Sequence, residues 1–167
     1  LTATWEPLVS SYTVNYYLNG TEQKVAESET KSAAWGSTVE TSDLAKTIDG
    51  YTVVPGQDAT ITVNREGSST INVYYYQNVN LVANSKTDEV YDGTEKSVSG
   101  FTGAPDGADF SAITVGATGT NAGTYPANFA DDAVNTVDAT GKYIVNSAQN
   151  GELIISPVAQ KVTVTIK

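Results

Sequence analysis

Hydrophobic and polar residues alternate along short stretches of the chain, which is the period-2 pattern of strands with one buried and one solvated face. In the stretch SYTVNYYL, four side chains share one face of the expected strand: Tyr12, Val14, Tyr16 and Leu18. The pair Asn19-Gly20 follows and favours a two-residue type I′ turn, whose central residues both take positive φ. The pattern therefore predicts a hairpin whose second strand covers residues 21–29.

One short helix and three more strands complete the first predicted unit, residues 11–78. Thr41, Ser42 and Asp43 are typical helix-capping residues, so the stretch DLAKTI is predicted to be a short helix that ends at Gly50. Strands are predicted in YTVVPG, ATITVN and INVYYYQ, with a turn at residues 66–67 before the last of them. This order of elements predicts a small α+β sheet of the β-grasp kind.

Residues 79–159 have a looser, all-β pattern and form the second predicted unit. Strands are predicted in VNLVA, in VYDGTEKSVSGF, in ADFSAITVGA and in AGTYPANF. The stretch GKYIVNSAQNGELIIS is predicted to be a hairpin that turns at Asn150-Gly151, with Leu153 and Ile155 on one face. This pattern predicts a sandwich of about seven short strands.

Charge makes two partner classes improbable for the chain. The sequence has 9 basic and 19 acidic residues, for a net charge of -10, and both halves contribute: 4 basic and 9 acidic residues up to Asn78, then 5 and 10. Such a surface repels nucleic acid and anionic membranes. No apolar run approaches the ~20 residues that span a bilayer, so no membrane insertion is predicted. The absence of an initiator Met indicates a processed or excised segment.

The tyrosine-rich strands resemble a known family of surface repeats. YTVNYYLNGT, IDGYTVVPG and the closing INVYYYQ are similar to the mucin-binding-protein (MucBP) repeats of Gram-positive surface proteins, over residues 11–78. The shared features are an opening tyrosine-rich strand, a G-Y-T step and a closing strand with paired tyrosines. The resemblance implies a β-grasp module of an extracellular protein.

A second resemblance covers residues 79–158. VYDGTEKSVSGF, then AGTYPANF, then GELIIS resemble the MBG-type modules of bacterial adhesins, in which Y-D-G-T opens, G-T-Y lies in the middle and G-x-L-x-I closes. This implies an immunoglobulin-like sandwich within a long, multi-repeat, cell-surface protein. It also implies an extracellular location, with cell-wall anchoring through regions outside this segment.

The two ends resemble parts of neighbouring repeats. LTATWE is similar to the last strand of a Listeria-Bacteroides-type repeat, so residues 1–10 are predicted to be the tail of a preceding repeat or a linker. QKVTVTIK, residues 160–167, resembles QNVNLVAN at the start of the second unit. It is either the first strand of a following copy or the last strand of this unit, formed by Val162, Val164 and Ile166.

The consecutive tyrosines of INVYYYQN raise a binding hypothesis. If this strand pairs with SYTVNYYL, Ile71, Val73 and Tyr75 point inward. The outward side chains are then Tyr17, Tyr74 and Tyr76. These three form either a platform on which a sugar ring of a host glycan or mucin stacks, or ordinary cross-strand pairs that stabilise the sheet.

The acidic residues of the second unit offer a calcium hypothesis. In VYDGT, Asp92-Gly93 is a turn signature, which favours a purely structural role for this stretch. The alternative is a calcium site with Asp88, Glu89 and Asp92 as oxygen ligands, or one that uses the acidic pairs at 106 and 109 or at 131 and 132. None of these has the spacing of a calcium loop, so no metal or other cofactor is predicted.

Catalysis is not predicted either. The chain has no Cys, Met or His, so disulfides, thiolate metal sites and the commonest general base are missing. Two-carboxylate glycoside hydrolysis by an all-β hydrolase remains as a distant alternative, because only the distance between carboxylates decides it. A Lys–Asn isopeptide bond beside a carboxylate is a further hypothesis, for which the intact mass is the test.

The sequence therefore predicts a non-catalytic structural or stalk segment of a bacterial surface adhesin, with adjacent repeats of the same chain as neighbours. The alternative is a module that binds a glycan, mucin or another extracellular protein through Tyr17, Tyr74 and Tyr76.

Overall fold

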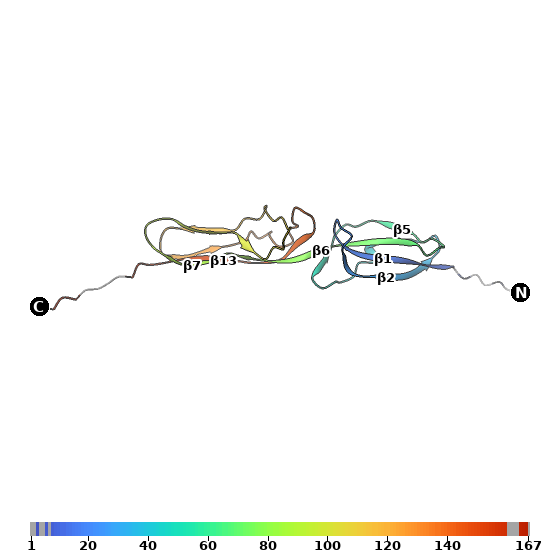
Figure 1. Ribbon diagram of the computed structural model, residues 1–167, viewed down its shortest axis with the longest axis horizontal. Coiled ribbons are helices and arrows are strands. Elements are labelled where there is room, and N and C mark those ends of the chain that lie inside the picture. Colours follow the sequence, from blue (N-terminus) through green and yellow to red (C-terminus); the bar gives the residue numbers. More distant parts are fainter. Residues whose placement is uncertain (1–2, 4–5, 7, 160–163, 167) are drawn as a thin grey trace. The chain divides into compact units, whose positions relative to one another are not determined.

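The computed structural model describes residues 3, 6, 8–159 and 164–166, and these residues fall into two compact units. The first unit contains the chain up to Asn78 and the segment Thr140–Ile144, and the second contains Val79–Ala139 and the chain from Val145 onward. The described residues are mainly β, as predicted, with a single 3-10 turn (Figure 1). No helix among them is long and apolar enough to cross a bilayer.

The main sheet of the first unit is built around its opening strand, β1 (Val9–Leu18). β2 (Lys24–Ala34) pairs with β1 in antiparallel fashion, and β6 (Ser69–Ala83) pairs with it in parallel fashion on the other side. β4 (Tyr51–Val53) is antiparallel to β6. Figure 1 shows β1, β2 and the green β6 side by side in this unit.

The predicted inward faces of these strands are confirmed. In β1 and in the part of β6 that belongs to the first unit, seven side chains are less than a tenth exposed: Tyr12, Val14, Tyr16, Leu18, Ile71, Val73 and Tyr75. The antiparallel pair of β3 (Thr38–Glu40) and β5 (Thr60–Thr62), together with the buried Leu44 and Val63, packs against most of them. Alternation in the sequence therefore identifies the core of the first unit.

The turn after β1 differs from the prediction. Gly20 has a φ of +71°, but Asn19 has a negative φ, so the turn is not type I′. The loop extends to Gln23, where Leu18 N–H donates to the Gln23 carbonyl at 2.9 Å. Asn19 is held in place by other partners, because its N–H donates to the Tyr75 carbonyl at 2.8 Å. The hairpin itself is formed, as predicted.

The predicted helix DLAKTI is wrong. Only one 3-10 turn, η1 (Thr41–Asp43), forms there, and the chain after Leu44 is irregular. The buried Tyr75 hydroxyl accepts the Lys46 N–H at 3.0 Å and donates to the Lys46 carbonyl at 2.8 Å. A helix would need both of these main-chain groups, so a tertiary contact overrides the local capping signal.

The remaining strands lie wholly or partly in the second unit. They are β7 (Lys86–Val90), β8 (Lys96–Ser99), β9 (Phe101–Thr102), β10 (Gly116–Gly119), β11 (Gly123–Ala127), β12 (Tyr143–Gln149) and β13 (Gly151–Ser156). β13 lies between β11, to which it is antiparallel, and β7, to which it is parallel. β8 pairs with β10, and β9 pairs with the end of β6. β6 and β12 each contribute residues to both units.

The core of the second unit is assembled from strands and loops. β6 contributes Val79, Leu81 and Ala83, and β13 contributes Leu153 and Ile155, as its predicted face requires. Loop residues add Phe110 and Phe129, both less than a tenth exposed. The Phe129 ring packs against Phe101 at 5.9 Å between centroids. Alternation alone therefore finds only part of this core.

Two strand predictions fail in this unit. The stretch ADFSAITVGA is irregular up to Val115, and only its last two residues belong to β10. The predicted hairpin at Asn150-Gly151 does not form either, because β12 lies beside β6 whereas β13 pairs with β11 and β7. The chain passes from one sheet to the other at Gly151, where only a glycine fits closely: a Cβ there would lie 2.5 Å from the Asn84 carbonyl oxygen. The predicted turn is therefore wrong as well: neither Asn150 nor Gly151 has a positive φ, and Gly151 is already the first residue of β13.

The end of the chain forms no strand where it is described. Val164 and Ile166 are 78% and 91% exposed and have no strand conformation. The interpretation of this segment as the last strand of the second unit is therefore wrong for these residues. Val162, like residues 1, 2, 4, 5 and 7 of the predicted N-terminal tail, lies outside the described residues.

Candidate functional site

Two of the three predicted platform tyrosines lie together on the outer face of the first unit. Tyr17 of β1 and Tyr74 of β6 are register partners, and their rings are 6.2 Å apart at an angle of 42°. Both side chains are half-buried. Tyr76 lies two residues further along the same face of β6, where its register partner is Thr52 of β4. The pair Tyr17–Tyr74 is therefore the centre of the candidate site.

Gln57 fixes the main chain of Tyr74. The Gln57 side-chain amide accepts the Tyr74 N–H at 2.9 Å through Oε1 and donates to the Tyr74 carbonyl at 2.9 Å through Nε2. The Val54 N–H also donates to this carbonyl, at 3.0 Å. This reciprocal pair replaces the strand neighbour that Tyr74 lacks on that side and holds the main chain that carries its ring.

A groove of about 640 Å³ lies beside Tyr74, and the loop after β1 forms its other wall. The lining residues are Asn19, Gly20, Thr21, Glu22 and Tyr74. Thr21 stiffens this loop, because its N–H and its hydroxyl both donate to the Leu18 carbonyl, at 3.0 and 2.8 Å. The groove thus combines an aromatic face with amide, hydroxyl and carboxylate groups, a combination suited to a polar ligand with an apolar face.

A row of polar side chains continues the outer face next to the ring pair. Ser28 Oγ donates to Asn15 Oδ1 at 2.6 Å, and Asn15 Nδ2 donates to Asn72 Oδ1 at 3.0 Å. Each asparagine precedes a platform tyrosine by two residues, so both point to the same side of the sheet. This row was not predicted from the sequence, although Asn15 and Tyr17, like Asn72 and Tyr74, have the two-residue spacing of one strand face.

The inner tyrosines take part in a different polar cluster. The Tyr16 hydroxyl donates to Glu29 Oε2 at 2.9 Å, and the Lys46 ammonium donates to Glu29 Oε1 at 2.5 Å. Lys46 Nζ also lies 4.3 Å from the centre of the Tyr16 ring. These contacts tie β2 and the irregular segment after η1 to the core.

Burial and hydrogen bonding shift the pKa values of the two phenols and of Glu29. Burial, and then the hydrogen-bonded Glu29 carboxylate, raises the pKa of the Tyr16 phenol well above its ordinary value. Hydrogen bonds from Lys46 and from Tyr16 hold the pKa of Glu29 below its usual value. Burial likewise raises the pKa of Tyr75. Both phenols therefore stay protonated at neutral pH and donate hydrogen bonds, Tyr16 to Glu29 and Tyr75 to the Lys46 carbonyl.

Two of the predicted calcium ligands, Glu89 and Asp92, form ion pairs with lysines. Lys96 Nζ lies 2.8 Å from Asp92 Oδ2 and 3.7 Å from Glu89 Oε2, while Lys86 Nζ lies 2.5 Å from Glu89 Oε1. The Lys96 ammonium, and then Thr94, lowers the pKa of Asp92. Asp88 is exposed and is not a partner in these ion pairs. Among the described residues, no three acidic side chains converge as a metal site requires.

The turn interpretation of VYDGT is confirmed in detail. Asp92 Oδ1 accepts the Thr94 N–H at 2.9 Å, which is an Asx-turn, and Gly93 has a φ of +80°. Thr94 Oγ1 donates to the same carboxylate oxygen at 2.5 Å. The other acidic pairs are dispersed in loops, where Asp109, for instance, accepts the Ser111 N–H at 3.0 Å.

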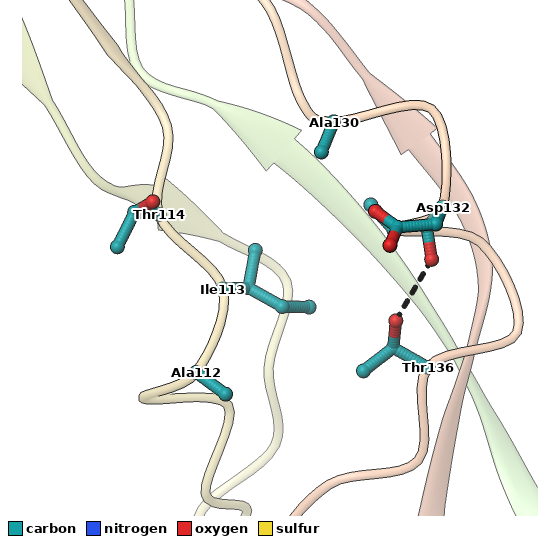
Figure 2. A pocket seen from close by; sticks show the side chains of 7 residues that line it. Ala112, Ile113, Thr114, Ala130, Asp132 and Thr136 are labelled. Atoms are coloured by element: carbon teal, nitrogen blue, oxygen red, sulfur yellow. Dashed lines mark hydrogen bonds between the residues drawn. The ribbon is translucent and has the colours of Figure 1, made fainter.

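A smaller cavity of about 280 Å³ lies among the loops of the second unit. Figure 2 shows that small side chains surround it and that Asp132 is its acidic residue. The Thr136 hydroxyl donates to the Asp132 main-chain carbonyl at 3.1 Å. Among the described residues that line this cavity, Asp132 is the one carboxylate, and glycoside hydrolysis uses a pair.

Several lysines form ion pairs with carboxylates. Lys46 contacts Glu29, and Lys96 contacts Asp92 and Glu89. Asn15 and Asn72 bond to each other and to Ser28 instead. None of these contacts sets up the Lys–Asn geometry of an isopeptide bond, and that hypothesis remains open to an intact-mass measurement.

Comparison with known proteins adds no relationship to these observations. No family model matches the chain, and no curated protein matches it significantly. The case for a function therefore depends on the strands and contacts described above.

Proposed function

We propose that the chain is a non-catalytic spacer segment of a multi-repeat bacterial surface adhesin. In this proposal the first unit is a MucBP-like β-grasp module and the second is an MBG-type, immunoglobulin-like module. The motifs in YTVNYYLNGT and VYDGTEKSVSGF support the assignment. The chain acts outside the cell, where it separates a distal domain from the cell wall.

The observation that carries the proposal is the pairing of the first and last strands of the first unit. β1 opens this unit and β6 closes it, and the two strands run parallel from Tyr12↔Ser69 to Leu18↔Tyr75. Parallel neighbours begin at the same end of a sheet and finish at the other. The chain therefore enters this unit at one end and leaves it at the opposite end, as a spacer requires.

The second unit repeats this arrangement. β7 lies near its beginning, β13 lies near its end, and the two are parallel, with Leu153 opposite Lys86 and Ser156 opposite Val90. The surface suits a solvated spacer as well, because a net charge of -10 discourages self-association. Two units with the same entry and exit geometry favour a spacer over an isolated binding domain.

Spin-label distances test the entry and exit geometry. The chain has no Cys, so labels are placed without further substitutions. With a rise of about 3.3 Å per residue, Val9→Cys and Asn78→Cys should lie about 40 Å apart, and Val9→Cys and Ser68→Cys about 10 Å apart. A short distance in the first pair would contradict the spacer proposal.

A second function, glycan binding, is favoured by one observation: the Tyr17–Tyr74 ring pair borders a polar groove. A sugar ring stacks on such a face, and the asparagine row and the groove supply hydrogen bonds. A glycan and mucin array should then show binding that the double variant Tyr74→Ala, Tyr76→Ala loses. Thr13→Ala, Thr70→Ala on the same outer face is the matched control. If the unsubstituted chain binds nothing on the array, the glycan-binding function is contradicted and only the spacer proposal remains.

A further inference from the structure

We propose that the two parallel strand pairs, β1–β6 and β7–β13, are mechanical clamps that resist tension along the chain. The proposal depends on the spacer function, because a spacer between a wall and a bound target is pulled at both of its ends. It goes further by naming the contacts that resist the pull.

The direction of the strands decides how tension acts on the first clamp. Force on the first unit pulls β1 back at its start and pulls β6 forward at its end, so the two strands must slide past one another. Seven consecutive register pairs, from Tyr12↔Ser69 to Leu18↔Tyr75, hold them together. Evenly spaced parallel hydrogen bonds are then strained at the same time and must break together. An antiparallel hairpin pulled at its open end breaks its bonds one after another.

Side chains reinforce the first clamp on both faces. On the outer face, Asn15 Nδ2 donates to Asn72 Oδ1 at 3.0 Å, and the Tyr17 and Tyr74 rings pack together. On the inner face, the Tyr16 and Tyr75 rings are 6.3 Å apart. The main-chain bond from Asn19 N–H to the Tyr75 carbonyl, at 2.8 Å, continues the ladder beyond the last residue of β1. Sliding by one residue would break all of these contacts.

The second clamp is shorter and less regular. β7 and β13 have three register pairs, with an irregularity between Leu153 and Ile155. One more main-chain bond extends it, from Tyr91 N–H to the Ser156 carbonyl at 2.9 Å. Fewer bonds are strained together here, so the second unit should yield at a lower force than the first.

Single-molecule pulling with two attachment geometries tests the first clamp on the full chain. Val9→Cys with Asn78→Cys applies force along the parallel pair, so that β1 and β6 slide. Val9→Cys with Ser68→Cys applies force at the end where both strands start, so that they peel apart. The two variants share one anchor, and urea denaturation establishes that their unfolding free energies match. A third measurement pulls the unsubstituted chain by its own termini.

The sliding geometry should give a rupture force several-fold higher than the peeling geometry. Lys86→Cys with Ser156→Cys should give an intermediate force for the second unit. Pulling at the two ends of this chain should show two events, with the second unit opening first. Equal forces in the sliding and peeling geometries would overturn the clamp. If the two rupture forces are equal but the distance between labels at Val9 and Asn78 is about 40 Å, the clamp is contradicted and the spacer proposal still stands. A short distance between these labels would contradict both proposals.

Discussion

The two units form their buried cores from different kinds of residue and different packing. The core of the first unit is rich in tyrosines on alternating strand positions, such as Tyr12, Tyr16 and Tyr75, and two of their hydroxyls bond to Glu29 and Lys46. The second unit has smaller aliphatic strand residues and long irregular loops. Its main chain instead comes unusually close to itself at several glycines. Strand alternation thus specifies the first unit, and close backbone packing specifies much of the second.

The largest expected effect concerns Gly103, where the second unit is most sensitive. A Cβ at Gly103 would lie 2.0 Å from the Asn80 carbonyl oxygen, and its φ of +105° disfavours any L-residue. Gly103→Ala should therefore lower the free energy of unfolding of the second unit by about 3 to 5 kcal/mol. Urea denaturation measures this loss.

The matched control is Gly107→Ala, at another positive φ, +85°, in the same loop. No atom lies within 4 Å of its Cβ position, so only backbone strain remains and the cost should be about 1 kcal/mol. Similar losses for both variants would mean that close packing does not distinguish the second unit.

Adjacent tyrosines of β6 should behave very differently in the first unit. Tyr75 is 1% exposed, so Tyr75→Ala should cost about 3 to 5 kcal/mol, as a large cavity in a core does. Tyr74 lies on the outer face, and Tyr74→Ala should cost under about 1 kcal/mol. Equal losses in urea denaturation would contradict the assignment of faces.

A smaller effect should appear in acid. Because the folded-state pKa of Glu29 lies below the unfolded value of about 4.5, its contribution to stability is present above that pH. The contribution is lost as the pH falls through the folded-state pKa. Lys46, Tyr16 and Lys31 face this carboxylate. In the second unit, the Lys96 ammonium likewise lowers the pKa of Asp92.

The variant Glu29→Gln isolates this effect. It should be less stable than the unsubstituted chain at neutral pH, and the difference should shrink as the pH falls below about 4.5. Glu27→Gln, an exposed position on the same strand, is the control and should follow the unsubstituted chain throughout. A difference for Glu29→Gln that does not change with pH would show that its contribution is not electrostatic.

The contrast between the units also explains what sequence alone could predict. The buried faces of β1 and β6 follow from alternation, because each residue's environment is set by its own strand. The failed predictions, the helix after Asp43 and the hairpin at Asn150-Gly151, depend on distant partners: the Tyr75 hydroxyl in one case and the Asn84 carbonyl in the other. Local patterns carry no information about such contacts.

The candidate site shows the same limit. Alternation places Tyr17, Tyr74 and Tyr76 on the outer face, but it does not reveal which strands are neighbours. The parallel register brings Tyr17 to Tyr74 and leaves Tyr76 opposite Thr52. The asparagine row required the same information, because Asn15 meets Asn72 only in this register.

The parallel register of the first and last strands of the first unit is the central claim, and cross-linking tests it most directly. Thr13 and Thr70 are register partners on the outer face, at a separation that a disulfide spans. Thr13→Cys with Thr70→Cys should oxidise readily in the folded chain, with a mass loss of about 2 Da. Thr13→Cys with Tyr76→Cys should remain reduced under the same conditions. Cross-linking of the second pair but not of the first would contradict the parallel arrangement, and with it the spacer and the clamp.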